Sequence, residues 1–283
     1  MPVHCPIAIP RLNQKEFGEI SFRVMEQVFA IHRDFGRLFD ERIYNQELGQ
    51  RLPGVQLEIP VDVSHRTFTK RYFLDVLTIE GGLFEFKTVE NLTPRHRAQL
   101  LNYLLLLDLA HGKLVNLRPG EVQHEFVNAA MTTEERRRFT VQRNNFDAQT
   151  PGAPTLEGII IPLLEDLGTS LELGLYEEAV THFLGSEAIV ERDIEVHSSD
   201  GTVLGAQRLR LCAPQAALKI TTFPNLPPSF GEHCRRLLLH LPLEVVQWVN
   251  IANHAVTFTT VRKTTERFVA EKLSERPGAT AEL

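Results

Sequence analysis

The stretch that most constrains the fold of this chain is residues 71–89, which read RYFLDVLTIEGGLFEFKTV. It predicts two short strands joined by a turn at a pair of glycines. Side chains in a strand alternate between the two faces of the sheet. If residues 80–82 form a three-residue loop, Asp75 lies opposite Lys87, and Glu85 shares their face. The sequence therefore predicts two carboxylates and one ammonium group on a single face of a mostly apolar hairpin.

This group of charges has two interpretations. Charged side chains are rarely buried unless they are paired or bind a metal ion. Asp75 and Glu85 offer the oxygen ligands that Mg²⁺ prefers, and Mg²⁺ often uses only one or two carboxylates. Lys87 would then lie near the attacking water or the scissile phosphate of a substrate. The alternative is a solvated strand edge with an ordinary surface ion pair, which is almost neutral in energy.

Residues farther along the chain extend the pattern. Asp75 and the triplet from Glu85 to Lys87 are followed by Gln99 and Tyr103, four residues apart and therefore on one face of a helix. The ordered set D…ExK…QxxxY resembles the PD-(D/E)xK nuclease superfamily, in the version that carries a QxxxY helix. Upstream, residues 35–44 resemble the signature of the GxxExxY protein family.

The second resemblance rests on Glu41 and Tyr44, which supply the ExxY part of the signature. The glycine that usually stands three residues before the glutamate is replaced by Leu38. The resemblance runs from about residue 21 to about residue 127, nearly half of the chain.

The resemblance implies an α/β fold with a mixed central sheet flanked by helices, a restriction-endonuclease-like core. It implies a nuclease that hydrolyses phosphodiester bonds of DNA or RNA with Mg²⁺ or Mn²⁺, so nucleic acid is the expected partner. Its site residues correspond here to the metal ligands Glu41, Asp75 and Glu85 and to the catalytic residues Lys87, Gln99 and Tyr103. Without the resemblance, Glu41 could merely complement a helix N-terminus, and Tyr103 could be a core residue with Gln99 at its rim.

Periodicity places the remaining elements of the first half. Apolar residues at helical spacing predict helices near 16–35 and 39–52, and alternation predicts a strand over 55–63, at a sheet edge because it contains Pro60. Thr93 and Pro94 suit the start of a helix that runs to about residue 110. Two further strands follow at 113–117 and 121–127, and a charged helix is expected over 132–142. We therefore expect a nuclease-like domain over 15–142 and a linker over 143–154.

The second half resembles a degenerate copy of the first, and we expect this domain over 155–271. Residues 163–176 align with 31–44 without a gap, and similar strands and a helix follow in the same order. The chemistry is lost, because Leu173, Leu209, Lys219 and Thr221 replace the three acids and the lysine, while Gln99 and Tyr103 fall near Arg236 and His240. The copy could pack on the first half as an intramolecular pseudo-dimer about a pseudo-two-fold axis. The alternative is an unrelated α+β domain.

Composition limits the partners. The net charge of −6 argues against nucleic-acid binding through bulk electrostatics, so a local basic patch is needed. Residues 95–97 beside the proposed site are one candidate, and the arginines of 136–138 are another unless they form a solvated helix face. No apolar run is long enough to cross a membrane, and the first residues lack a signal-peptide pattern.

Three widely spaced cysteines indicate reduced thiols and a cytoplasmic protein rather than a disulfide framework or zinc site. A homo-oligomer is compatible with the sequence, and the polar tail after Lys272 is expected to fray. The rival to the nuclease is a non-catalytic scaffold that binds nucleic acid or protein and keeps the nuclease fold. Three acids and a lysine disfavour the rival, because losing an unneeded buried charge often stabilises a fold.

Overall fold

The computed structural model describes residues 2–143 and 145–263. Its first half is built around a sheet in the order β1-β2-β3-β4-β5-β6. The predicted polar tail, and residues 264–271 of the predicted second domain, lie outside the described residues. The elements of the first half are β1 (Val3–His4), α1 (Gln14–Phe35), α2 (Glu41–Arg51), β2 (Val55–His65), β3 (Phe68–Thr78), β4 (Leu83–Lys87), α3 (Pro94–Leu106), β5 (His111–Asn116) and β6 (Gln123–Asn128).

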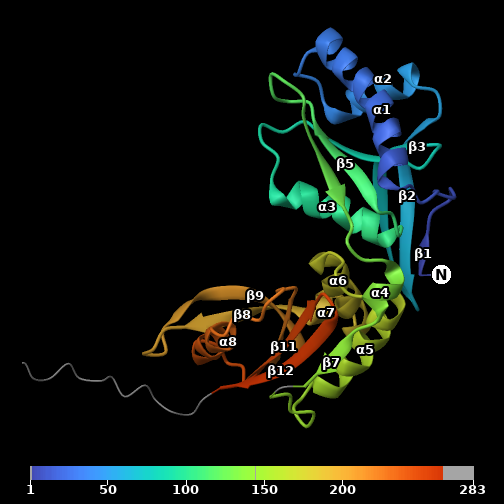
Figure 1. The fold of residues 1–283 in the computed structure, drawn as a ribbon. Coiled ribbons are helices and arrows are strands. Elements are labelled where there is room, and N and C mark those ends of the chain that lie inside the picture. Colours follow the sequence, from blue (N-terminus) through green and yellow to red (C-terminus); the bar gives the residue numbers. More distant parts are fainter. Residues whose placement is uncertain (1, 144, 264–283) are drawn as a thin grey trace, which may run out of the picture.

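Helices cover both faces of the first sheet (Figure 1). Asn13 caps α1, because its side chain accepts from Glu16 N while the Glu16 carboxylate accepts from Asn13 N. The apolar stripe of α1 packs, together with α2, on one face of the sheet in a cluster that includes Val76 and Phe86. Helix α3 packs on the opposite face. The α/β fold with a mixed sheet between helices is therefore confirmed.

The central hairpin keeps its predicted faces but not its predicted register. Leu77 pairs with Leu83 and Val76 with Phe84, so the predicted pairing of Asp75 with Lys87 is wrong by two residues. Ile79 N donates to Gly54 O at 2.8 Å instead of joining the hairpin, and Thr78 N donates to Gly82 O at 2.9 Å, so the last hairpin bond encloses residues 79–81. A slip of two residues leaves every side chain on its original face.

The second half forms another sheet, in the order β7-β12-β11-β10-β9-β8. Strand β7 (Thr140–Gln142), which follows α4 (Thr133–Arg137) and precedes α5 (Ala153–Leu167), pairs with β12 (Ala255–Arg262) in parallel. The elements are α4 (Thr133–Arg137), β7 (Thr140–Gln142), α5 (Ala153–Leu167), α6 (Leu173–Leu184), α7 (Glu187–Val190), β8 (Glu191–His197), β9 (Val203–Ala213), β10 (Ala216–Thr221), α8 (Phe230–Leu239), β11 (Val245–Ala252) and β12 (Ala255–Arg262).

The two sheets share the same pattern of pairing. In each, an antiparallel, a parallel and an antiparallel pair follow one another, from β3 to β6 and from β9 to β12. Glu85 pairs with Leu114 in the first sheet. Lys219 pairs with Trp248 at the corresponding place in the second. The alignment that set Lys219 against Glu85 therefore agrees with the strand registers.

Two local hydrogen-bond motifs also occur in both halves. Tyr44 OH donates to Gly36 O at 2.8 Å and accepts from Phe39 N at 3.3 Å. Tyr176 OH donates to Gly168 O at 2.8 Å and accepts from Leu171 N at 3.0 Å. In both halves the tyrosine fixes the turn between two consecutive helices.

The second motif follows the parallel strand pair. The Asn116 side chain accepts from Val89 N at 3.1 Å and donates to Val89 O at 2.7 Å. The Asn250 side chain accepts from Phe223 N at 2.9 Å and donates to Phe223 O at 3.1 Å. Each amide thus holds the chain that leaves β4 or β10.

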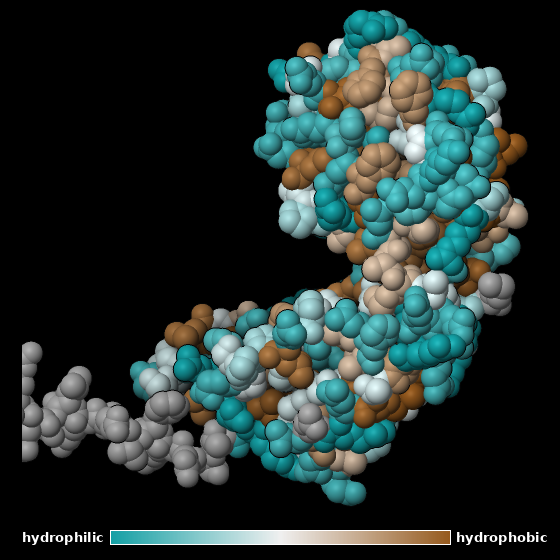
Figure 2. All heavy atoms as spheres, viewed as in Figure 1, coloured by the Kyte–Doolittle hydropathy of each residue, from teal (hydrophilic) through white to brown (hydrophobic). Residues whose placement is uncertain are grey.

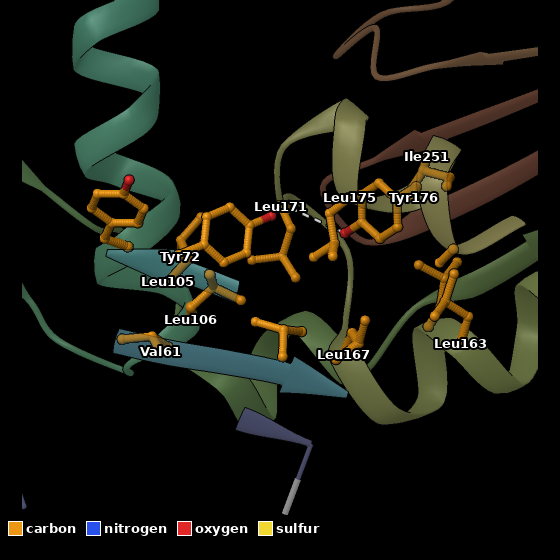
Figure 3. Packing of buried hydrophobic residues seen from close by; sticks show 14 of the residues in the cluster. Val61, Tyr72, Leu105, Leu106, Leu163, Leu167, Leu171, Leu175, Tyr176 and Ile251 are labelled. Atoms are coloured by element: carbon orange, nitrogen blue, oxygen red, sulfur yellow. Dashed lines mark hydrogen bonds between the residues drawn. The ribbon is translucent and has the colours of Figure 1, made fainter. Parts of the chain in front are cut away.

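The halves pack through different faces. The α3 face of the first sheet and the α5–α6 face of the second share one hydrophobic cluster, part of which is drawn in Figure 3. Lys70 Nζ on β3 lies 3.0 Å from Glu172 Oε1 and 2.8 Å from Glu178 Oε1. Tyr72 OH donates to Glu172 Oε1 at 2.6 Å. Equivalent elements do not meet in these contacts, so the pseudo-two-fold packing considered from the sequence is wrong.

The segment between the halves corrects the predicted helix over 132–142. Helix α4 ends at Arg137, and Thr140–Gln142 forms a strand of the second sheet. Arg136 is buried, so it does not lie on a solvated helix face. It donates to Leu105 O at 2.7 Å and to Leu167 O at 2.7 Å. Arg136 is buried because carbonyls at the end of a helix have no donor within the helix, and its guanidinium supplies one to each.

The face of the molecule drawn in Figure 2 is mostly hydrophilic, with hydrophobic side chains scattered over both halves. In this view the two halves enclose an angle that is open on one side. Among the described residues, no helix combines the length and apolar character needed to cross a membrane.

Candidate active site

The three predicted acids converge on Lys87 from three elements. Glu41 is the first residue of α2, Asp75 lies in β3, and Glu85 lies two residues before Lys87 in β4. Lys87 Nζ lies 2.6 Å from Glu85 Oε1, 3.5 Å from Asp75 Oδ2 and 3.7 Å from Glu41 Oε2. Strand alternation accounts for the shared face of the hairpin residues. The turn between α1 and α2, which Tyr44 fixes, places the Glu41 carboxylate near the same ammonium group.

Asp75 also stabilises the backbone of the hairpin. The pairs recorded between β3 and β4 are Leu77 with Leu83 and Val76 with Phe84. Beyond them, Asp75 Oδ2 accepts from Phe86 N at 3.0 Å. The carboxylate therefore takes a backbone donor that would otherwise lack a partner at a buried position. This bond fixes Asp75 while its other oxygen remains for a ligand.

Burial makes two of the carboxyl groups unusually basic. The Glu85 side chain has no exposed surface. Burial, followed by the negative charge of Asp75, raises the pKa of Glu85 to about 8. The same causes in the same order raise the pKa of Glu41 to about 7. Both groups therefore gain or lose a proton near neutral pH, which is a common property of functional sites.

Lys87 is the counter-charge of this cluster. Burial acts to lower the pKa of Lys87, but Glu85, Asp75 and Glu41 together outweigh burial and raise it above its ordinary value. The ammonium form is therefore the stable form at neutral pH. In that form Lys87 donates hydrogen bonds and cannot accept a proton.

The donor set fits a hard divalent cation. Over residues 2–143 and 145–263, no group of three or more His, Cys, Asp or Glu side chains is already arranged around a metal position. At this site the Lys87 ammonium lies among the three carboxylates. Glu85 Oε2 is nevertheless buried without a hydrogen-bond partner. A buried carboxylate oxygen without a partner is costly, and Mg²⁺ or Mn²⁺ would satisfy it.

Gln99 and Tyr103 lie together on α3, as their spacing predicts. Gln99 Nε2 donates to Tyr103 OH at 3.0 Å. Burial raises the pKa of Tyr103 to about 12; the bond from Gln99 opposes this shift, and the charges of Glu85 and Asp75 add to it. The charges of the site therefore influence the pKa of Tyr103, although the hydrogen-bond partner of Tyr103 is Gln99. The Tyr103 ring packs edge-on against Tyr72 at 5.9 Å.

The N-terminus of α3 lies near the same charges. Thr93 N donates to His96 Nδ1 at 3.1 Å, which fixes the imidazole at the start of the helix. Burial, and then the positive charge of Lys87, lowers the pKa of His96. The partial positive charge of the helix N-terminus favours an anion such as phosphate here.

Sequence reasoning missed one supporting residue, Arg118. Its guanidinium donates to Arg37 O at 3.1 Å and to Thr88 O at 3.3 Å. It thereby ties the turn that precedes Glu41 to the chain that follows Lys87. A lone arginine after a strand carries no recognisable sequence signal, because both of its acceptors are backbone carbonyls distant in sequence.

The corresponding place in the second half has different chemistry. Lys219 stands at the strand position of Glu85, and Thr221 stands at that of Lys87. Thr221 Oγ1 donates to Asn250 Oδ1 at 2.7 Å and accepts from Trp248 Nε1 at 2.8 Å. Its hydroxyl group is therefore used within the fold, and no carboxylate of the alignment is left to bind a cation.

Comparison with known proteins agrees with this geometry. No curated protein and no solved structure matches the chain. Residues 18–129 match the family model described as the PD-(D/E)XK nuclease superfamily. The matched range contains Glu41, Asp75, Glu85 and Lys87 together with the QxxxY helix. The match supports the PD-(D/E)XK nuclease superfamily for the first half of the chain.

Proposed function

We propose that the first half is a metal-dependent nuclease that hydrolyses phosphodiester bonds of DNA or RNA. Glu41, Asp75 and Glu85 would hold Mg²⁺ or Mn²⁺. The observation that carries the proposal is the convergence of these three carboxylates on Lys87, with a buried Glu85 oxygen left without a partner. A scaffold would gain nothing from keeping such a group.

The metal ion, when bound, supplies a Lewis acid and an activated water. Lys87 keeps its proton, because the carboxylates raise its pKa. It therefore orients the attacking water and donates to phosphoryl oxygens, where negative charge develops during the reaction. Gln99 and Tyr103 supply further donors for the substrate. Glu41 and Glu85 must lose protons before they bind a cation, so metal affinity should rise with pH through the range of their pKa values.

We also propose that the second half is a copy of the first that has lost its site. The shared order of elements, the matching strand registers and the repeated tyrosine and asparagine motifs support this proposal. Membership of the GxxExxY family is proposed on Glu41 and Tyr44, whose hydroxyl fixes the turn before the glutamate.

The test is cleavage of a mixed panel of labelled DNA and RNA by the full chain in Mg²⁺ and in Mn²⁺. Wild type should cleave at least one substrate, and Lys87→Ala should abolish cleavage. Lys219→Ala is the matched control, because it removes a lysine from the corresponding strand of the second half. Cleavage that persists in Lys87→Ala would contradict the assignment.

Metal binding has its own readout. Mg²⁺ should raise the Tm of the wild type, and Asp75→Asn should reduce that increase. If metal stabilises both proteins equally, these carboxylates are not the ligands. A protein that neither binds metal nor cleaves would be the scaffold considered from the sequence.

A further inference from the structure

The turn between α1 and α2 presents an apolar strip beside the site. Leu38 is 78% exposed, Phe39 is 47% exposed and Ile43 is 38% exposed. Glu41 lies within this strip in sequence and reaches Lys87. Large apolar side chains that gather in the open next to polar groups indicate a binding surface.

The second half shows what covers such a strip. The tyrosine motif sets Leu171 in the place of Phe39. Leu171 and Leu175 are buried, and they pack in the cluster that contains Tyr72 and Leu105 of the first half (Figure 3). In the first half the corresponding strip stays open and carries an aromatic ring. The Phe39 ring packs edge-on against Phe35, with ring centroids 5.9 Å apart, and against Tyr44, with ring centroids 6.3 Å apart.

Charges of both signs flank the open strip: Asp40 is exposed beside Phe39, and three arginines lie on this turn and at the start of α3. Arg37 and Arg42 flank Phe39 and Glu41 in sequence, and Arg95 lies at the start of α3 beside His96. All three arginines are exposed, and none forms an ion pair with a described residue. The protein as a whole carries a net charge of −6. Two cations without ion-pair partners among the described residues therefore lie on the turn and helix that carry Glu41, and a third lies at the start of α3. The substrate of the proposed site would be a polyanion.

We infer that the substrate is bound as a single strand, or with its bases unpaired, and that Phe39 stacks on a base while the arginines contact phosphates. The inference rests on the proposed function. A projecting ring can stack only on a base whose face is free, and stacking on aromatic side chains is the usual basis of single-strand binding.

The test measures binding of fluorescent oligonucleotides by the full chain in the Lys87→Ala background with Mg²⁺, which prevents turnover. A single strand and the duplex of the same sequence are compared by anisotropy. The single strand should bind more tightly. Phe39→Ala should weaken its binding roughly tenfold, as expected for one stacked base. Phe39→Trp should retain binding, and Phe22→Ala is the matched control, because Phe22 is 75% exposed on α1.

Three outcomes would overturn the inference. The first is unchanged single-strand affinity in Phe39→Ala. The second is a duplex that binds as tightly as the single strand. The third is a change of oligomeric state in Phe39→Ala, measured by light scattering, which would make the strip a protein interface. If the wild type cleaves no nucleic acid and the Lys87→Ala protein binds none, the proposed function fails as well. If the Lys87→Ala protein binds a single strand and Phe39→Ala leaves that affinity unchanged, only this inference fails.

Discussion

Replacing Glu85 by glutamine tests whether the buried carboxyl group destabilises the metal-free fold. The Glu85 side chain has no exposed surface, and burial raises its pKa from the ordinary 4.5 to about 8. Glutamine has nearly the same shape and never ionises. The variant therefore removes the titration while keeping the packing and the hydrogen bond from Lys87.

The sign of the effect follows from proton linkage. Because the pKa of Glu85 is raised in the folded state, the folded protein holds this proton more tightly than the unfolded chain does. Stability contributed by this group is present below its unfolded pKa and is lost as pH rises toward 8. Between pH 5 and pH 7.5, titration of Glu85 lowers the free energy of unfolding of the wild type by about 3 kcal/mol. In Glu85→Gln, residue 85 does not titrate and makes no such contribution.

The assay is urea unfolding at a series of pH values from about 5 to 7.5 in EDTA. The free-energy difference between Glu85→Gln and wild type should grow with pH in favour of the variant. Glu19→Gln is the control, because Glu19 is 70% exposed on α1. A difference that stays constant across this range would refute the reasoning. Adding Mg²⁺ near pH 7.5 should stabilise the wild type more than the variant.

Three further sets of substitutions have expected outcomes. Lys87→Met should lower the metal-free free energy of unfolding by about 3 kcal/mol at pH 7.5, because buried carboxylates lose their partner; urea unfolding measures this, and an unchanged midpoint would contradict it. Arg136→Leu should cost about 3 kcal/mol or more by leaving buried carbonyls without donors, whereas exposed Arg137→Leu should change the Tm little. Tyr44→Phe and Tyr176→Phe should each cost about 1–2 kcal/mol, since each removes the same pair of hydrogen bonds; markedly unequal losses would argue against equivalent turns.

The sequence predicted the faces of the hairpin better than its register. Faces depend only on alternation, so Asp75, Glu85 and Lys87 meet although the pairing of the strands is shifted by two residues. The register depends on Ile79, which bonds to Gly54 of a neighbouring turn rather than to the facing strand. Such a contact between separate segments leaves no periodic signal in the sequence.

The environment of Arg136 was equally beyond sequence reasoning. Three arginines after two glutamates are typical of a solvated helix, and Arg137 and Arg138 are indeed exposed. Arg136 alone turns inward, because the ends of α3 and α5 meet there and leave carbonyls that need a donor. The local sequence pattern predicts that the helix starts at Thr132. Tertiary packing determines that the Arg136 side chain is buried.

The same packing indicates how the second half, which lacks the site carboxylates, supports the first half, which has them. The α3 face of the first sheet is buried by α5 and α6, and Tyr72, whose ring contacts Tyr103 of the QxxxY helix, donates to Glu172 of the second half. Burying that face contributes stability roughly in proportion to its apolar area. The second half therefore holds α3, and with it Gln99 and Tyr103, against the sheet that carries Asp75 and Glu85. In the proposed duplication, the second half keeps this contact, so the loss of its own site does not weaken the site of the first half.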